Sequence, residues 1–431
     1  MSDRHLPVRP NLEQLKHQAK DLLAEVRAGD PAAIADFQRH LPKKFAPAAA
    51  AANNWASAKL SDAQTVLARS YAVASWPRIV LACKITDAIW RDDVDGVRQL
   101  VLKHPRLLHE SALGREKSNW GAPMSYAANL GRDGIIAMLR SLGATDVAHA
   151  LSRAVLQGQV ETARKLHAML GGAPLDPDIL KSPAYTLSVQ GTAVLFELGA
   201  TVVDVDGRRL APVDWVLETD SRNPSALHQI LEMYVQHGLA LPDTPTMALF
   251  RGRIDLLEKH LQRDPGLLQR QFSFQEIYPP EFGCHNEVMA THGTPLQGAT
   301  LLHIAVDYDE FETAQWLLAR GMNVDAKAAV DSDGFGGHTA LFGTVVSQPN
   351  FWMNHNHKPQ VAPFTQLLLD HGADPNARAS LRKRIHPGYE LGDTLHEYRD
   401  VTPLSWGQRF CFKKLVSVPA MELIAAKGGH A

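Results

Sequence analysis

The sequence predicts an all-α fold in which short paired helices repeat along most of the chain. The stretch from Gly298 to Ala326 contains two runs of apolar residues at helical spacing, separated by a turn and followed by glycine. The first run starts 21 residues before that glycine, from Thr300 to Gly321, and the same distance separates Ala122 from Gly143. A chain of 431 residues also exceeds the size at which one compact core keeps growing. Small repeated units therefore account for both the length and the pattern.

Composition limits the classes of partner. Hydrophobic residues make up 45% of the chain and charged residues 21%, which is typical of a soluble folded protein. The formal net charge of −2 creates no overall field for nucleic acid or an anionic membrane. We find no apolar signal segment at the start and no apolar run of membrane-spanning length. We therefore expect a cytoplasmic protein with no nucleic-acid or membrane partner and no cofactor.

Three stretches carry a recurring threonine motif. They are TLLHIA at 300–305, TALFGT at 339–344 and TPLSWG at 402–407, and GADPNA at 372–377 supplies a turn after a helix. Threonine can cap a helix and proline suits its first position, while Gly372 suits a left-handed stop. These motifs resemble the ankyrin repeat, whose marker is T-P-L-H-x-A. The resemblance implies an α-solenoid of stacked helix–loop–helix units with a concave face, which usually recognises protein partners.

The repeats are expected from Thr86 to the C-terminus, about nine in number. Those in 85–270 are degenerate, and two of them end in Pro-x-Leu-Leu instead of Gly-Ala-Asp. Those in 271–431 are clearer but carry long loop insertions. A helical segment also precedes the repeats in many bacterial ankyrin-repeat proteins, and residues 1–84 of this chain resemble such a leader.

Residues 1–84 do not fit the repeat and form a separate helical segment. In the stretch 12–26, leucine, alanine and valine fall on one helical face, and Gly29 ends the helix. Ser61 or Asp62 is expected to cap a further helix that leads to Trp76. A stack of repeats leaves an apolar face uncovered at its end, so we interpret 1–84 as an N-terminal cap.

Three excursions interrupt the repeat in 271–431. Thr339 to Gly372 spans 33 residues instead of 21, an insertion of 12 between two helices that includes FWMNHNHKPQ. Gly372 to Thr402 spans 30 residues where about 12 are usual, an insertion of 18 in a finger loop. The third excursion is 271–297. Compact domains seldom keep long loops without a use, so these loops are candidates for function.

The excursions are rich in histidine, aromatic residues and arginine. Aromatic residues and arginine anchor many protein interfaces. The leading hypothesis is therefore a scaffold for protein–protein recognition through the loop-decorated C-terminal third. The candidate binding residues are His292, His338, Trp352, His355, His357, Arg382, Arg384, His396, Tyr398, Arg399 and Trp406.

The residues of these loops suit two ligand chemistries. His355 and His357 would point to one side of an extended segment, which suits two imidazole ligands of a metal. The chain lacks a longer metal motif, so solvated or hydrogen-bonded histidines explain this spacing better. Four basic residues lie in 378–384, and arginine suits carboxylate or phosphate. A small anionic ligand is therefore a candidate beside a solvated face or a partner contact.

Three further motifs favour structural interpretations. HEYRD at 396–400 could supply a general acid or base, but its charges are better explained as salt bridges that hold the finger. DGFGGH at 333–338 is a weak phosphate cradle, and a tight turn explains its glycines. DYDEFE at 307–312 falls on an interhelical turn, where solvated carboxylates are expected and Asp309 replaces the usual glycine.

The alternative function is a small-molecule-binding protein or enzyme, such as a hydrolase, with a pocket formed by the excursions over the concave face. No nucleophile with its base can be placed from spacing alone. The path of the excursions separates the two hypotheses. Convergence on one pocket with His292, His338, His355 or Tyr398 directed inward favours the enzyme, and splayed loops favour the scaffold.

Overall fold

The computed structural model describes residues 4, 6–42, 44, 55–115, 118–219, 221–284, 293–346, 360–384 and 394–431. The chain is mostly helical and divides into two compact units, Met1–Pro174 and Leu175–Ala431, called here the N-terminal unit and the C-terminal unit. Within the described ranges, no helix combines the length and the apolar character needed to cross a membrane.

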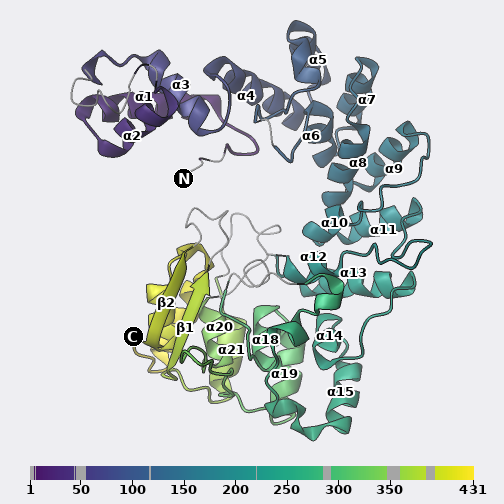
Figure 1. The fold of residues 1–431 in the computed structure, drawn as a ribbon, viewed down its shortest axis with the longest axis vertical. Helices are drawn as coiled ribbons and strands as arrows, with labels where there is room; N and C mark the ends of the chain where they lie inside the picture. The colour runs from purple at the N-terminus through teal and green to yellow at the C-terminus, as the bar shows by residue number, and fades with distance from the viewer. Residues whose placement is uncertain are drawn as a thin grey trace. The chain divides into compact units, whose positions relative to one another are not determined.

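The N-terminal unit consists of a leader followed by three helix pairs (Figure 1). Its helices are α1 (Leu12–Ala28), α2 (Pro31–His40), η2 (Trp55–Ser57), α3 (Leu60–Ser70), α4 (Trp76–Trp90), α5 (Val94–Lys103), η3 (Pro105–Leu108), α6 (Pro123–Asn129), α7 (Asp133–Ser141), α8 (Val147–Leu156) and α9 (Val160–Met169). The first helices of successive pairs pack together, α4 on α6 and α6 on α8, and α5 packs on α7. Each pair thus covers the apolar face of the next.

The leader helices follow the predicted apolar pattern. Helix α1 buries one face and ends at Gly29, whose φ of 84° is the left-handed conformation that favours glycine. The predicted cap at Ser61 or Asp62 is wrong, because α3 begins at Leu60 and Lys59 is its N-cap residue. Asp62 instead accepts a hydrogen bond from the backbone N–H of Lys59 at 2.8 Å. A carboxylate three residues into a helix can reach back in this way.

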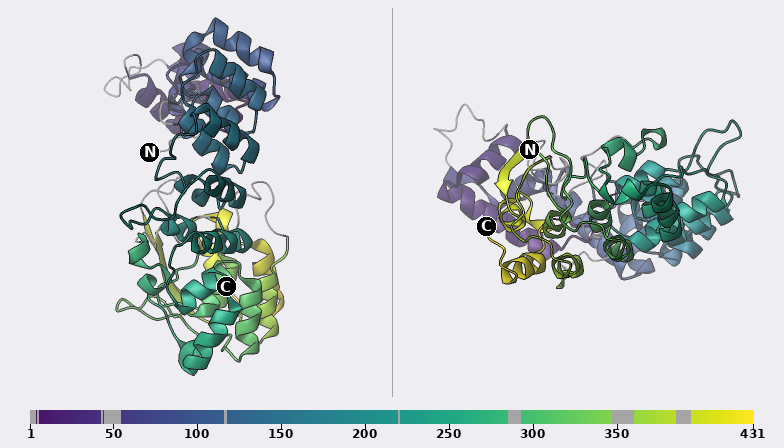
Figure 2. Two further views of the ribbon diagram at one scale, coloured as in Figure 1. Left: turned by 90° about the vertical axis from the view of Figure 1, so that its right-hand side faces the viewer. Right: turned by 90° about the horizontal axis from the view of Figure 1, so that it is seen from below.

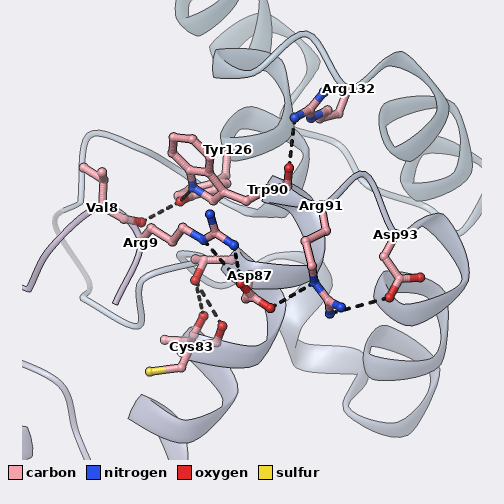
Figure 3. A network of polar contacts seen from close by, with 11 residues as sticks. Val8, Arg9, Cys83, Asp87, Trp90, Arg91, Asp93, Tyr126 and Arg132 are labelled. Carbon is pink, nitrogen blue, oxygen red and sulfur yellow. Dashed lines mark hydrogen bonds and ion pairs between the residues drawn. The ribbon is translucent and has the colours of Figure 1, made fainter. Parts of the chain in front are cut away.

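A polar network joins the start of the chain to α4 and α6 (Figure 3). The indole N–H of Trp90 donates to the Tyr126 hydroxyl at 2.6 Å, and that hydroxyl donates to the Val8 carbonyl at 2.5 Å. Arg9 pairs with Asp87 at 2.7 Å and lies 5.5 Å from the centre of the Trp90 ring. The segment before α1 is therefore fixed to the first two helix pairs.

The C-terminal unit contains six helix pairs and one hairpin of strands within its described residues. Its elements are α10 (Lys181–Tyr185), α11 (Val189–Glu197), α12 (Val213–Glu218), α13 (Pro224–Gln236), α14 (Pro245–Phe250), α15 (Ile254–Arg263), η4 (Pro265–Gln269), α16 (Phe274–Ile277), η5 (Pro280–Phe282), α18 (Leu301–Asp307), α19 (Phe311–Ala319), α20 (Ala340–Val345), α21 (Pro363–Asp370), β1 (Ala379–Arg384), β2 (Leu395–Val401), α22 (Pro403–Arg409), η7 (Lys413–Leu415) and α23 (Val418–Ala426). Helices α18, α20 and α22 pack in series, and α21 packs on α23.

The turn inside the helix pairs uses one left-handed residue at a recurring place. The residues with positive φ between paired helices are Asp92, Gly131, Gly158, Leu187, Gly252 and Asp309. Asp309 has a φ of 61°, as expected for a position where glycine is usual. Thr402 caps α22 by accepting from the Ser405 N–H, and Pro403 opens that helix, as the motif predicted.

The prediction of an all-α chain requires one correction. The finger-loop insertion after Gly372 forms an antiparallel hairpin, with Leu381 opposite Tyr398 and Arg384 opposite Leu395. These strands lie beside the C-terminal helices (Figures 1 and 2). Side chains on β1 alternate between buried and more exposed, so an insertion with two-residue periodicity pairs with itself instead of forming a loop.

Replacing Asp309 by glycine should raise the free energy of unfolding by about 1 kcal/mol, because glycine adopts positive φ without the Cβ clash. Asp309→Ala is the matched control: it keeps a Cβ and loses the polar side chain that tolerates this conformation, so it should fall below wild type. Urea unfolding measures both variants. Equal stability for the two variants would contradict the assignment of strain to this residue.

Tyr126→Phe should lower the free energy of unfolding by roughly 1–2 kcal/mol, because the Trp90 indole and the Val8 carbonyl both lose their partner. Limited proteolysis of the segment before α1 should accelerate in parallel. Tyr71→Phe, which removes a single bond to Gln18, is the comparison and should have the smaller effect. Resistance to proteolysis equal to wild type would show that the network does not fix the leader.

Candidate functional site

Two excursions leave the C-terminal unit from neighbouring points. Thr294 follows one undescribed stretch, 285–292, and Val346 precedes another, 347–359. The Thr294 N–H donates to the Val346 carbonyl at 3.1 Å, and its hydroxyl lies 3.0 Å from the same oxygen. Thr294 is 4% exposed. The roots of these two excursions are thus joined in the core.

The hairpin meets this junction through two aromatic residues. The Trp406 indole N–H lies 3.3 Å from the Thr294 hydroxyl, and the Tyr398 ring stands perpendicular to the Trp406 ring at 4.8 Å. The Tyr398 hydroxyl accepts from the Cys411 N–H at 3.0 Å. Trp406 is fully buried and Tyr398 is 5% exposed. These two predicted binding residues therefore lie in the core, where they orient the hairpin and do not present their rings to a partner.

His338 also lies in the core, beside His303. The ring of His303 donates from Nε2 to the His338 carbonyl at 3.0 Å and accepts at Nδ1 from the Thr300 hydroxyl at 2.9 Å. His338 donates from Nε2 to the Pro295 carbonyl at 2.9 Å. Burial lowers the pKa of His303 to about 4 and that of His338 to about 3, the latter also through the neighbouring His303. Both imidazoles are therefore neutral at neutral pH.

A buried ion pair lies at the end of α18. Arg222, in the connection between α12 and α13, donates to Asp307 Oδ2 at 2.9 Å, and both side chains are almost fully buried. The Arg222 guanidinium also lies 4.2 Å from the centre of the Tyr308 ring, and Tyr308 shares a 2.7 Å hydrogen bond with Tyr278. Tyr278 belongs to the excursion 271–297, so this cluster fixes that excursion as well.

The expectation of solvated carboxylates in DYDEFE is wrong for two of them. Asp307 is 4% exposed and Glu310 is 5% exposed. Glu310 lies 2.5 Å from His228 Nε2, and Asp307 pairs with Arg222. Both partners are more than 80 residues away in sequence, which is why spacing within the motif gave no sign of them.

The outer side of the hairpin is exposed and well anchored. We call Arg382, Arg384, Leu395, Glu397 and Arg399 the hairpin face. Arg382 pairs with Asp331 at 2.7 Å and Asp333 at 2.8 Å in the adjoining finger. The Arg382 and Arg399 guanidinium groups lie 5.0 and 4.3 Å from the centre of the buried Phe335 ring. This arrangement holds two long side chains in place at the surface.

The two motifs of the finger and hairpin adopt the structural interpretations. In DGFGGH, Gly336 has a φ of 122°, and a Cβ there would lie 1.9 Å from the Ala329 carbonyl oxygen, so only glycine fits this tight turn. In HEYRD, Asp400 pairs with Arg378 at 2.6 Å and Glu397 with Arg399 at 3.4 Å. His396 is half-buried opposite Lys383 on the inner side of the hairpin.

Four predicted residues lie outside the described residues. They are His292, Trp352, His355 and His357. The hypothesis of a metal at His355 and His357 therefore falls on undescribed residues. In the part of the chain that the structure describes, no three His, Cys, Asp or Glu side chains are grouped to hold a metal ion.

A cleft of about 500 Å³ lies between α15 and the excursion 271–297. Its walls carry both cations and carboxylates. Arg263 pairs with Asp243 at 3.1 Å, and Arg270 pairs with Glu276 at 2.7 Å. Because these arginines are already neutralised by neighbouring carboxylates, the cleft does not present a charge that would select an anionic ligand.

Comparison with known proteins identifies one repeat. Residues 297–329, which contain α18 and α19, match the model of the Ankyrin repeat family. The predicted resemblance is thereby confirmed for this segment. Ankyrin repeats generally mediate protein–protein interaction. A search of curated proteins gives no match. Among solved structures, the human ASB11 ankyrin repeat domain is 14% identical, with 72% of this chain and 99% of that chain covered and a TM-score of 0.26.

The buried histidines make the C-terminal unit sensitive to acid. Their folded pKa values lie below the ordinary value of 6.5, so the unfolded chain binds more protons and stability falls as pH drops below that value. Each buried histidine should lower the free energy of unfolding by about 3 kcal/mol as the pH falls from about 7 to about 4. His338→Gln should flatten the pH dependence of unfolding, and exposed His371→Gln is the matched control. An identical pH dependence in wild type and His338→Gln would contradict this prediction.

Proposed function

We propose that the chain is an ankyrin-repeat scaffold for protein–protein recognition, and that the hairpin face contacts the partner. The observation that carries this proposal is the clamped arrangement of Arg382 and Arg399 over Phe335 on an exposed two-stranded finger. We propose that the helix pairs from α4 to α23 are about nine repeats, of which the pair α18 and α19 matches the Ankyrin repeat family model. We assign 1–84 as the cap, 85–270 as degenerate repeats and 271–431 as the recognition part of a bacterial, cytoplasmic α-solenoid.

The chemistry of the hairpin face suits a protein partner. Leu395 is 45% exposed, and Val330 in the adjoining finger is 61% exposed, so apolar surface lies among the arginines. Arg382 and Arg399 already have restricted positions, which lowers the conformational entropy lost when a partner binds. Asp331, Asp333 and Glu397 offset the positive charge, which disfavours nucleic acid.

The candidate residues divide into three groups. Tyr398, Trp406 and His338 support the surface from the core, since each joins the hairpin or finger to the junction at Thr294 and Pro295. Arg384 and Arg399 belong to the hairpin face itself. His292, Trp352, His355 and His357 flank the same junction in sequence, and we propose that they extend the partner surface.

Site-specific photo-crosslinking tests the proposed surface. A photoreactive amino acid at Leu395 or Val330 should capture a defined partner from a lysate of the source cells. The same amino acid at Leu102, which is 62% exposed on α5, is the matched control and should not capture it. Arg382→Ala together with Arg399→Ala should weaken this capture at least about tenfold, because interface arginines contribute on the order of 1–2 kcal/mol or more.

Two results of this experiment would contradict different parts of the proposal. Capture of the same proteins at Leu102 and Leu395 would show that the surface is not selective. Capture at Leu395 could also survive the double arginine substitution, even when Trp352→Ala and Arg384→Ala are added to it. That result would assign recognition to other residues. Arg253→Ala removes a surface ion pair with Asp255 elsewhere in the unit and controls for a general loss of charge.

A small-molecule function is the second candidate, and one observation favours it. The roots of two excursions meet where Thr294 bonds to Val346, so these two excursions leave the core from neighbouring points. Native mass spectrometry of the purified full chain, with elemental analysis for metal, should detect a retained ligand if this candidate holds. Mass equal to that of the bare chain, with no metal, would retire it.

A further inference from the structure

A small cavity lies between α18, α20 and the segment before α18. Asp307, His338, Thr294 and Gly343 are among the residues that line it, and its volume is about 10 Å³. A cavity of this size accommodates the centre of a single water-sized molecule. Asp307 is 4% exposed and His338 1% exposed, so polar groups that face this space are removed from bulk solvent.

Each of these two side chains has an acceptor atom without a hydrogen-bond partner among the described residues. His338 uses Nε2 to donate to the Pro295 carbonyl, which can only accept, so the ring proton is on Nε2 and Nδ1 carries a lone pair. Asp307 accepts a hydrogen bond from Arg222 at Oδ2, and its Oδ1 has no donor among the described residues. A buried acceptor without a donor is costly, and two line the same cavity.

We propose that this cavity is a binding site for one small molecule that donates two hydrogen bonds, to Asp307 Oδ1 and His338 Nδ1. Water is the occupant that the charges favour. The Asp307 carboxylate is already neutralised by Arg222 at 2.9 Å, so a second cation gains little there. A metal ion would need further ligands. His303 also lines the cavity, but its Nδ1 and Nε2 are already hydrogen-bonded to Thr300 and to the His338 carbonyl, and no group of three His, Cys, Asp or Glu among the described residues could hold a metal ion.

The site links segments that are distant in sequence. Asp307 connects through Arg222 to the α12–α13 connection, and His338 connects through Pro295 to the end of the excursion 271–297. A donor between them completes a continuous line of hydrogen bonds across α18 and α20. Its function is to fix the orientation of His338, and with it the junction at Thr294. This proposal does not depend on the proposed function.

Two measurements on the full chain test the site. Magnetic relaxation dispersion of water counts long-lived internal waters, and nitrogen NMR of labelled histidine reports whether His338 Nδ1 accepts a hydrogen bond. Wild type should show an Nδ1 resonance shifted upfield from that of an unbonded nitrogen. Gly343→Ala, which adds a methyl group beside the cavity and meets Val306 at 3.3 Å, should remove one long-lived water and reverse that shift.

Gly134→Ala in α7 is the matched control, since its Cβ meets only Val94 at an ordinary 3.6 Å and Gly134 is not among the residues that line this cavity. It should change neither the water count nor the His338 resonance. Replacing sodium chloride by ammonium chloride at equal concentration distinguishes the occupants: a changed Nδ1 shift identifies ammonium, and an unchanged shift identifies water. An unbonded Nδ1 in wild type, with equal water counts in wild type and Gly343→Ala, would overturn the proposal.

Discussion

The ion pair between Arg222 and Asp307 is the constraint on which the C-terminal unit depends. Both charges are almost fully buried, so each needs the other and its additional hydrogen bonds. Arg222 also donates to the Thr219 carbonyl at 2.7 Å, and its guanidinium lies over the Tyr308 ring. The pair therefore fixes the α12–α13 connection against α18. Loss of either residue would leave the other charge buried without its partner, so this packing requires both.

Buried polar contacts near this pair also hold the roots of the excursions and the base of the hairpin. Tyr308 joins Tyr278 in the excursion 271–297, and His338 joins Pro295 at the next root. Thr294 then connects to Trp406, on which the hairpin packs through Tyr398. The exposed arginines of the hairpin face are thus supported by a core that combines apolar packing with directional bonds. The helix pairs form the framework, and these contacts position the excursions and the hairpin on it.

The sequence predicted those structural features that depend on contacts between residues close together in the chain. The helix pairs, the left-handed turn at Asp309 and the cap at Thr402 follow from spacing and residue type, because they involve contacts within about one turn of helix. The pairing of Arg222 with Asp307 joins residues 85 apart, and no local signal encodes it. The hairpin could have been predicted from the alternation in SLRKR and LHEYRD, but its charges suggested a solvated loop. Trp406 resembled an interface anchor, yet its place in α22 directs it to the core.

Hydrogen exchange on charge-deletion variants tests most directly whether the ion pair organises the surface. Asp307→Leu leaves a buried guanidinium unpaired, and such a change costs about 3–5 kcal/mol. Exchange at the backbone amides of Thr294, Val346 and the hairpin strands should accelerate, with the helices of the N-terminal unit as internal reference. Arg222→Met combined with Asp307→Leu should restore most of the protection, because no charge remains unpaired. Unchanged exchange at the hairpin in Asp307→Leu, or no recovery in the double variant, would contradict this interpretation.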